Sequence, residues 1–425
     1  YSRAFVLQGS APRADLKQSI SVMADSPGAL EVPKGFTQGY DRLVAEAGAL
    51  FGSRMYRHYT WLLSLSDHID HFGLEHHESS DDRMEENALN DPDLRMRLGR
   101  LLGHEYVHSW NGKYRRPEIQ LSPDHQKPMD GSLLWVYEGM TEFWGDVLPT
   151  RAGLITPDYI REMLAESAGY FDIEPGARWR PLVDTAVAAQ ILYFAPDAWR
   201  SSRRGVDFYG ASVFLWLDVD EELRDRTQGR ETLDDFMKRF CAGESGAPQL
   251  KPFMEQDIYG TLTSMAPADW RAFIRRHLDT VGTAALFGAL ERSGWKLMYS
   301  SDPNAAIETD QKRSKTTNRQ WSIGLIVDKD SRIVDVIDDR AAARAGAGPG
   351  MTVVAVNDRK FSANALDSAI IDAQRTRKPI ELLVETGDYF RRLSVEYYDG
   401  PRYPHLVRLE GRPDTLSAIF SPRVK

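Results

Sequence analysis

Residues 104–108 read His104-Glu105-Tyr106-Val107-His108, and this short stretch decides how the whole chain is interpreted. On a helix with about 3.6 residues per turn, two histidines four positions apart lie about 40° apart on one face, so both imidazoles can bind the same ion. Glu105 would then lie beside a metal-bound water, whose pKa zinc lowers toward about 7. The spacing therefore predicts one zinc ion held by His104 and His108, with Glu105 as the general base.

The sequence before the motif predicts the helix that carries it. Asp91 is suited to cap a helix, and Pro92 is suited to its first position. An apolar stripe then runs into His104 and consists of Leu94, Leu98, Leu101 and Leu102.

A third metal ligand is expected on a following helix. Glu138 lies thirty residues after His108 in the otherwise apolar segment 133–148, where a carboxylate is costly to bury unless it is paired or bound to a metal. Glu142 follows one helical turn later and is a candidate to orient a ligand histidine, although a solvated helix face would explain it equally well. The competing interpretation is that the two histidines are exposed or capped and that Glu138 is solvated. It would require the spacing of the histidines, the position of Glu105 and the position of Glu138 to agree by chance.

Five more histidines lie upstream of the motif, namely His58, His68, His71, His76 and His77. They could hold a second metal, but their spacing is irregular on any predicted element, and histidines satisfied by polar neighbours are commoner beside a cleft. We therefore expect one metal site, with His76 as a candidate lining residue of the substrate site.

Two longer segments extend the pattern beyond the metal ligands. Residues 104–117 read His-Glu-Tyr-Val-His-Ser-Trp-Asn-Gly-Lys-Tyr-Arg-Arg-Pro, and residues 137–146 read Tyr-Glu-Gly-Met-Thr-Glu-Phe-Trp-Gly-Asp. Both resemble the glycyl aminopeptidase family of PDZ-containing gluzincin metallopeptidases, and the resemblance continues through 73–76, 216–220, 403–406 and 413–414. It implies a thermolysin-like core that releases N-terminal amino acids from peptides with a free N-terminus, preferring small residues such as Gly or Ala. It also implies an upstream β-rich domain, of which residues 1–38 would be a remnant.

The segment Gly73-Leu74-Glu75-His76 is a candidate for reading the substrate N-terminus. An aminopeptidase must hold a free α-ammonium about one residue from the metal-bound carbonyl, and a carboxylate supplies a charge-assisted acceptor for it. The segment follows a predicted strand at 56–65 and resembles the Gly-x-Glu motif of related gluzincin aminopeptidases. We expect Glu75 to bind the ammonium and Gly73 to let the backbone approach the substrate, with a surface glutamate in a polar loop as the alternative.

Tyr209 is the candidate donor to the oxyanion. The segment 208–216 resembles a family segment in which a tyrosine precedes a glycine by three residues, and a phenol is a neutral donor suited to a developing negative charge. Phe208 and Ser212 replace the tyrosine and glycine that are more usual there. A plain core tyrosine is therefore the alternative.

A change of composition divides the chain. Its 425 residues, 42% hydrophobic and 27% charged, suit a folded protein of two or three domains. Helical patterns dominate up to about residue 310, apart from the strand at 56–65 and a weakly patterned segment at 1–37. The helices are expected at 39–54, 91–108, 157–170, 213–226, 233–241 and 267–278. Short β-rich runs follow at 323–327, 333–337, 351–356 and 380–385.

The expected fold is therefore α+β. It comprises an N-terminal segment at 1–38, a mainly helical thermolysin-like zinc catalytic domain with a small edge sheet at 39–312, a PDZ-like β-sandwich at 313–400 and a C-terminal extension at 401–425. Within the third part, Ser322-Ile323-Gly324-Leu325 resembles the carboxylate-binding loop of PDZ domains, whose backbone amides could hold a peptide C-terminus. A structural domain with a blocked groove is the alternative.

Bulk properties narrow the partners. The formal charge of −9, without a long Lys/Arg block, argues against nucleic acid, and no apolar run approaches the roughly 18 residues of a membrane span. The single Cys241 cannot form an internal disulfide. The sequence begins at Tyr1 and not at Met, so its upstream end stays open, and we expect a soluble protein of the cytoplasm or periplasm without a choice between them.

Two other functions compete with the aminopeptidase. One is a metallo-endopeptidase with the same zinc chemistry and an open cleft, and the other is a non-catalytic scaffold that binds peptides through the PDZ-like part. The intact Glu105 argues against the scaffold, since an inactive protein does not need the base.

Overall fold

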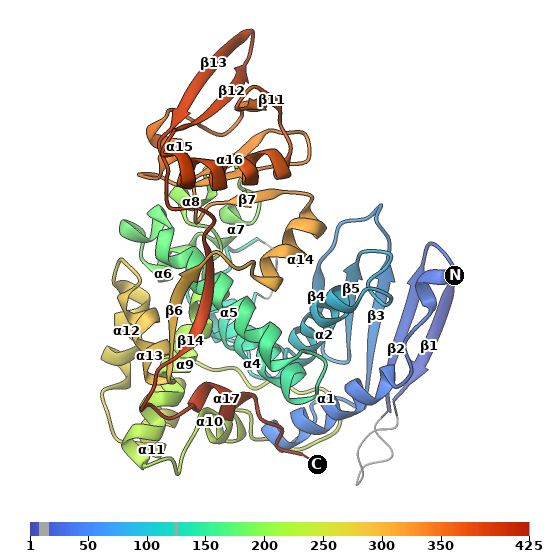
Figure 1. Cartoon of the computed structure of the whole chain (residues 1–425). Coiled ribbons are helices and arrows are strands. Elements are labelled where there is room, and N and C mark those ends of the chain that lie inside the picture. The colour runs from blue at the N-terminus through green and yellow to red at the C-terminus, as the bar shows by residue number, and fades with distance from the viewer. Residues whose placement is uncertain (8–16, 123, 125, 425) are drawn as a thin grey trace.

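Figure 1 shows the chain as a computed structural model, which describes residues 1–7, 17–122, 124 and 126–424. A twisted sheet lies on one side of a body of helices, and a smaller unit built from later residues lies against the end of that body (Figure 1). Within these described residues, no helix combines the length and the apolar character that crossing a membrane requires.

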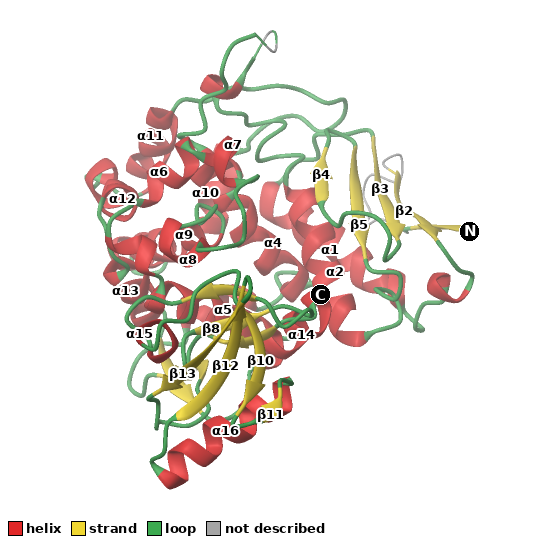
Figure 2. Cartoon of the chain, turned by 90° about the horizontal axis from the view of Figure 1, so that it is seen from above, coloured by secondary structure: helices red, strands yellow, loops and turns green. Residues whose placement is uncertain are grey.

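The sheet on the N-terminal side has five strands. Their spatial order is β1 (Ser2–Val6), β2 (Lys17–Ala24), β3 (His58–Leu65), β5 (Ser79–Met84) and β4 (Gly73–Glu75). The inner strands β2, β3 and β5 are parallel, whereas β1 and β4 run antiparallel at the two edges. Strand β4 is the strand nearest the helical body (Figure 2). The predicted strand at 56–65 is confirmed as β3.

Strands β1 and β2 occupy a segment in which the sequence pattern predicted no element. Ile20, Val22 and Ala24 are nevertheless buried at alternate positions of β2, as a half-buried strand requires. Because β2 pairs along its whole length with β3, residues 17–24 belong to the same sheet as the strand preceding the Glu75 segment.

The helices of the body carry most of the remaining chain. They are α1 (Phe36–Phe51), α2 (Pro92–Val107), α3 (Leu134–Tyr137), α4 (Gly139–Arg151), α5 (Pro157–Ile173), α6 (Leu182–Val187), α7 (Ala189–Leu192), α8 (Arg200–Arg203), α9 (Gly210–Thr227), α10 (Leu233–Phe240), α11 (Glu255–Met265), α12 (Trp270–Asp279), α13 (Ala284–Arg292), α14 (Ala305–Ser314) and α17 (Thr415–Phe420). The predicted helices are all present, with ends displaced by up to three residues.

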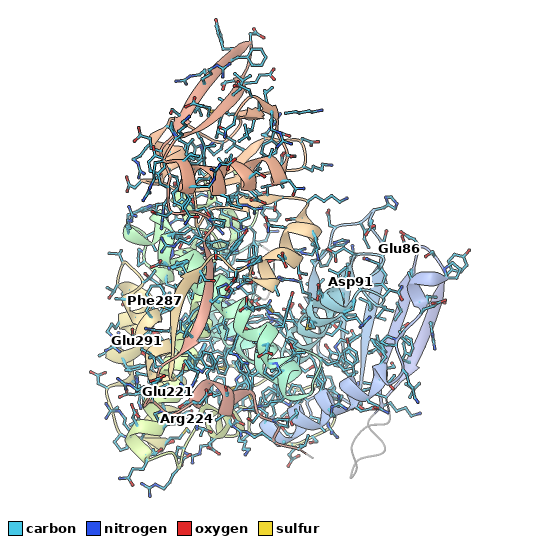
Figure 3. All side chains as sticks on the ribbon, in the orientation of Figure 1. Glu86, Asp91, Glu221, Arg224, Phe287 and Glu291 are labelled. Atoms are coloured by element: carbon cyan, nitrogen blue, oxygen red, sulfur yellow. The ribbon has the colours of Figure 1, made fainter. Side chains whose placement is uncertain are left out.

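Helix α2 begins where its sequence predicts. The Asp91 side chain, labelled in Figure 3, accepts from the backbone amides of Asp93 and Leu94 at 2.8 and 3.0 Å, and Pro92 occupies the first turn. The sheet packs on the other end of this helix, where Trp61 Nε1 donates to Leu102 O and Tyr59 OH donates to Glu105 O. The sheet therefore fixes the turn that carries the motif.

Helix α4 packs closely against α2 because glycines remove side chains from the contact. A Cβ on Gly145 would lie 3.0 Å from His104 Cβ, and a Cβ on Gly103 would clash with Pro149. The apolar segment 133–148, expected as one element, is divided into α3 and α4 at Glu138. The division places Glu138 at the junction of two helices that face the end of α2.

The smaller unit has its own hydrophobic core. It contains a three-stranded sheet, β7 (Thr317–Arg319), β8 (Leu325–Val327) and β9 (Ile333–Val336), and a four-stranded sheet in the order β11 (Arg359–Lys360), β10 (Thr352–Val356), β12 (Ile380–Thr386) and β13 (Tyr389–Val395). Its helices are α15 (Ala341–Arg344) and α16 (Ala363–Thr376). The predicted β-rich runs are thus confirmed as strands, with α16 beside them.

The chain then returns to the body. Strand β14 (Tyr403–Arg408) pairs antiparallel with β6 (Trp295–Ser300), and α17 packs against α4. The last residues of the chain therefore lie against the helices that carry the candidate site.

Candidate metal centre

The ends of α2 and α3 bring three ligand atoms together. His104 Nε2 and His108 Nε2 lie 3.1 Å apart, and Glu138 Oε2 lies 3.4 Å from the first and 3.3 Å from the second. Metal bonds of about 2.0–2.1 Å at tetrahedral angles place neighbouring ligand atoms about 3.3–3.4 Å apart. All three side chains are largely buried, so the set fits a tetrahedral metal such as zinc with its fourth position open.

The far side of each imidazole is also held. His108 Nδ1 donates to Asn111 O at 2.9 Å, and this bond leaves the Nε2 lone pair for a metal. His104 Nδ1 lies 2.9 Å from Glu142 Oε2, and Arg100 pairs with both Glu142 and Asp146. Glu142 therefore lies beside a candidate ligand histidine, and its role in orienting that histidine stays a prediction.

Glu105 faces the same space from α2. Its side chain is buried, and its Oε2 has no hydrogen-bond partner among the described residues. Burial raises the pKa of Glu105 to about 7, even though His104 and His108 act to lower it. A Cβ on Gly73 would collide with the Glu105 carboxylate. The glycine thus makes room for Glu105, a role that the sequence interpretation, based on approach to the substrate, did not include.

Glu75 reaches the centre from the edge strand β4. One ligand atom each of Glu75, Glu105 and His108 lie within 4.8 Å of one another. Tyr137 OH donates to Glu75 Oε1 at 2.6 Å, and Lys113 Nζ lies 3.1 Å from the same oxygen. Burial alone would raise the pKa of Glu75, but His108 and Lys113 lower it to about 2. Glu75 is therefore an ionised carboxylate with a cation beside it.

Tyr209 lies near His104, at the start of α9. The two rings have centroids 6.2 Å apart, and Tyr209 OH lies 2.6 Å from Tyr193 OH. Burial, with a further effect of Glu138, raises the pKa of Tyr209 well above its usual value. Burial likewise raises the pKa of Tyr193, so both phenols stay protonated at neutral pH. One hydroxyl donates to the other, which leaves one O–H to donate near the ligand set.

A cavity of about 330 Å³ adjoins this centre. It is lined by Glu75, Lys113, Arg116, Gln120, Met129, Gly131, Leu134, Tyr137, Glu138, Ala186, Val187, Ala189, Gln190 and Tyr193. The lining includes the expected N-terminus reader Glu75 and the candidate ligand Glu138, so the cavity opens between these two carboxylates.

Other predicted residues lie elsewhere. His76 is exposed after β4 and does not line the cavity. Among the residues described, no cluster of three potential metal ligands includes any of the five upstream histidines. Ser322, Ile323 and Leu325 are buried in the C-terminal unit, and Gly324 adopts a φ of 82°.

The sequence interpretation missed the residues that come from loops. Lys113 and Arg116 follow α2, and Tyr193 follows α7. Lys113 and Arg116 stand within the segment 104–117 used for the family resemblance, which is the signal that could have drawn attention to them. Tyr193 has no such signal, because only the folded chain brings it next to Tyr209.

Comparison with known proteins agrees with this arrangement. Residues 97–214 match the model of the M61 glycyl aminopeptidase family. No curated protein matches the sequence. An aminopeptidase N family protein from Idiomarina loihiensis superposes with a TM-score of 0.74 at 17% identity, over 99% of this chain and 70% of that one, and shows a shared fold. An M1 zinc metallopeptidase from Deinococcus radiodurans reaches a TM-score of only 0.38 at 15% identity, over 65% of this chain and 51% of that one.

The matched segment contains the whole candidate ligand set and Glu105. Residues 97–214 are therefore similar to the M61 glycyl aminopeptidase family, and the fold shared with the Idiomarina loihiensis protein extends over nearly the whole chain.

Proposed function

We propose that the chain is a zinc-dependent aminopeptidase that hydrolyses the N-terminal peptide bond of its substrate. The observation that carries the proposal is the spacing of His104, His108 and Glu138, whose ligand atoms lie 3.1–3.4 Å apart beside a buried glutamate. The match of residues 97–214 to the model of a peptidase family points the same way.

In this proposal each group near the centre has one task. Zinc, when bound, would activate a water molecule and polarise the scissile carbonyl. Glu105 accepts the proton of the attacking water at Oε2, the atom without a partner among the described residues, and passes it to the leaving amine. Tyr209, with Tyr193 beside it, donates to the oxygen on which negative charge develops.

Glu75 favours the aminopeptidase over the endopeptidase. Its carboxylate is ionised and close to His108 and Glu105, where it can accept a charge-assisted hydrogen bond from a free α-ammonium. The interior of a longer chain presents no such cation at that position. The preference for an N-terminal Gly rests on the description of the matched family, and its extension to Ala rests on the resemblance of the sequence to that family.

No observation favours a peptide-binding scaffold. The backbone amides of Ser322 and Gly324, two of the four in the loop that resembles a PDZ carboxylate site, already donate to Arg319 O. We assign residues 39–312 to the catalytic domain and 313–400 to a PDZ-like domain with a structural role.

The test combines two substrates with one variant. The zinc-loaded protein is expected to release p-nitroaniline from Ala-p-nitroanilide and not from its N-acetyl form. Glu105→Gln should keep its zinc, measured by mass spectrometry, and lose roughly 10²- to 10⁴-fold in kcat, because the ligands remain while the proton acceptor is gone.

Glu244→Gln is the matched control, since it makes the same substitution at an exposed position. It should retain the activity of the parent protein. Equal cleavage of the free and acetylated substrates would contradict the aminopeptidase, and near-normal turnover of Glu105→Gln would contradict the mechanism.

A further inference from the structure

The cavity beside the metal centre is larger than a Gly or Ala side chain needs. Its volume is about 330 Å³, whereas about 10–15 Å³ on the same measure suffices for one water molecule. A side chain several bonds longer than that of Ala therefore has room. What the cavity would select then depends on the polar groups of its walls.

The position of the cavity identifies the substrate group that would enter it. In the proposed function the α-ammonium of the N-terminal residue lies at Glu75, and its carbonyl lies at the metal bound by Glu138. Both glutamates line the cavity. The side chain of that residue projects from the carbon between these two groups, so it faces the cavity.

Three side chains that line the cavity offer hydrogen-bond donors. Gln120 is only 7% exposed, and its Nε2 has no partner in the part of the chain that the structure describes. Arg116 donates through Nε to Gly112 O at 2.9 Å, and its two η nitrogens have no acceptor among the same residues. Lys113 supplies an ammonium. An unpaired buried donor next to two cations suits an anionic acceptor.

The charges point to the same kind of ligand. Lys113 now pairs with Glu75 at 3.1 Å. A substrate ammonium at Glu75 would compete for that carboxylate, and a bound metal would engage Glu138. Lys113 and Arg116 would then line the cavity without a negative charge to neutralise them. A side-chain carboxylate would neutralise them, and Arg116 presents the planar fork that binds a carboxylate through two bonds.

We infer that this cavity accepts an acidic side chain, so that substrates with an N-terminal Glu or Asp are cleaved as well as those with Gly or Ala. The inference rests on the proposed function, because it uses the same carboxylate and the same metal to orient the substrate. It assigns Arg116, Lys113 and Gln120 to the recognition of that side chain.

The test compares two substrates of nearly equal shape. Glu-p-nitroanilide and Gln-p-nitroanilide differ in the charge of the terminal group, and kcat/KM for Glu should exceed that for Gln by about tenfold or more, as expected for hydrogen bonds to a charged group. Arg116→Gln should bring this ratio close to one, and Arg116→Lys should keep part of it. Arg271→Gln removes the same charge from an exposed position of α12 and should leave the ratio unchanged.

A binding measurement provides a second readout. Calorimetric titration of the zinc-loaded Glu105→Gln variant should show Glu-Ala binding more tightly than Gln-Ala, and adding Arg116→Gln should abolish the difference. If Ala-p-nitroanilide is cleaved but kcat/KM is equal for Glu-p-nitroanilide and Gln-p-nitroanilide, the inference is wrong and the proposed aminopeptidase activity still stands. A Glu preference that survives Arg116→Gln would overturn the role of Arg116. Failure to cleave even the Ala substrate would overturn the proposed function and the inference with it.

Discussion

Glu142 shows how much a single carboxylate can contribute behind a metal ligand. It lies 2.9 Å from His104 Nδ1 and is itself paired with Arg100. Such partners orient the imidazole and raise its basicity, and their loss typically costs 10- to 100-fold in metal affinity. We expect Glu142→Gln to weaken zinc binding by about that factor, measured by competition with a chelator of known affinity.

Asp146→Asn is the informative comparison for this variant. Asp146 also pairs with Arg100 but makes no hydrogen bond or ion pair with His104 within the described part of the chain, so its loss should weaken zinc binding less. An unchanged zinc affinity in Glu142→Gln would show that His104 is oriented by its helix alone.

The sequence predicted the candidate residues whose positions follow from helical spacing or from the family resemblance. His104, Glu105 and His108 follow from the geometry of one helix, and the structure gathers them with Glu138 as expected. Their chemical roles stay predictions. Lys113 and Arg116 escaped notice because a loop has no periodicity, and a cationic side chain in a loop is usually solvated.

At the scale of elements, the contact between α2 and α4 depends on a missing side chain. A Cβ on Gly145 would lie 3.0 Å from His104 Cβ and 3.1 Å from His104 Cα. We expect Gly145→Ala to lower the melting temperature and the zinc affinity together, because α4 must move away from the helix that carries His104.

Gly288 offers a matched control within α13. A Cβ there would meet nothing within 4 Å, so Gly288→Ala should raise the free energy of unfolding by about 0.4–1 kcal/mol. Both variants can be compared by thermal denaturation with and without zinc. A Gly145→Ala protein as stable as Gly288→Ala would mean that the two helices repack without cost.

Helices and strands were predictable where the residue types in the segment favour one kind of element. Asp91 with Pro92 predicted the start of α2, and a run rich in Tyr, Thr and Leu predicted the strand that became β3. The break between α3 and α4 was not predictable, because the apolar run continues through it. In the structure, Asn111 Nδ2 donates to Val136 O and Tyr137 O beside Glu138, so a contact from another segment accompanies the break.

At the scale of the whole molecule, the Asp234 carboxylate joins three distant segments through two ion pairs. Arg151 of α4 has a fully buried side chain and lies 2.8 Å from Asp234 of α10, and Arg423 near the end of the chain lies 3.4 Å from the same carboxylate. Burial alone would raise the pKa of Asp234, but the two arginines lower it.

A lowered pKa in the folded state means that this carboxylate stabilises the fold above its unfolded pKa of about 3.9 and loses that effect as the pH falls toward the folded value. We expect Asp234→Asn to lower the free energy of unfolding at pH 7 by about 3–5 kcal/mol, since Arg151 stays buried without a counter-charge. Urea denaturation of the parent protein and of Asp234→Asn at several pH values between 7 and 3 measures the difference in the free energy of unfolding. The difference should narrow below about pH 4, and a difference independent of pH would exclude the ion pair as its cause.

The sequence pattern did not predict how the domains of the chain are connected in space. Composition indicated the change near residue 310, because strands and turns replace helical periodicity there. The pairing of β6 with β14 joins residues about a hundred positions apart, and neither strand specifies its partner.

That pairing has a mechanical consequence. The C-terminal unit is an insertion between two segments of the body. The chain leaves the body after β6 and α14 and returns to it in β14, which pairs with β6. A unit attached by one linker is released by one proteolytic cut, but here a cut within residues 317–395 would leave both fragments anchored to the same body, the first through β6 and the second through β14 and α17. Its freedom to move relative to the body is restricted in the same way, since the chain enters the unit from α14 and leaves it into β14.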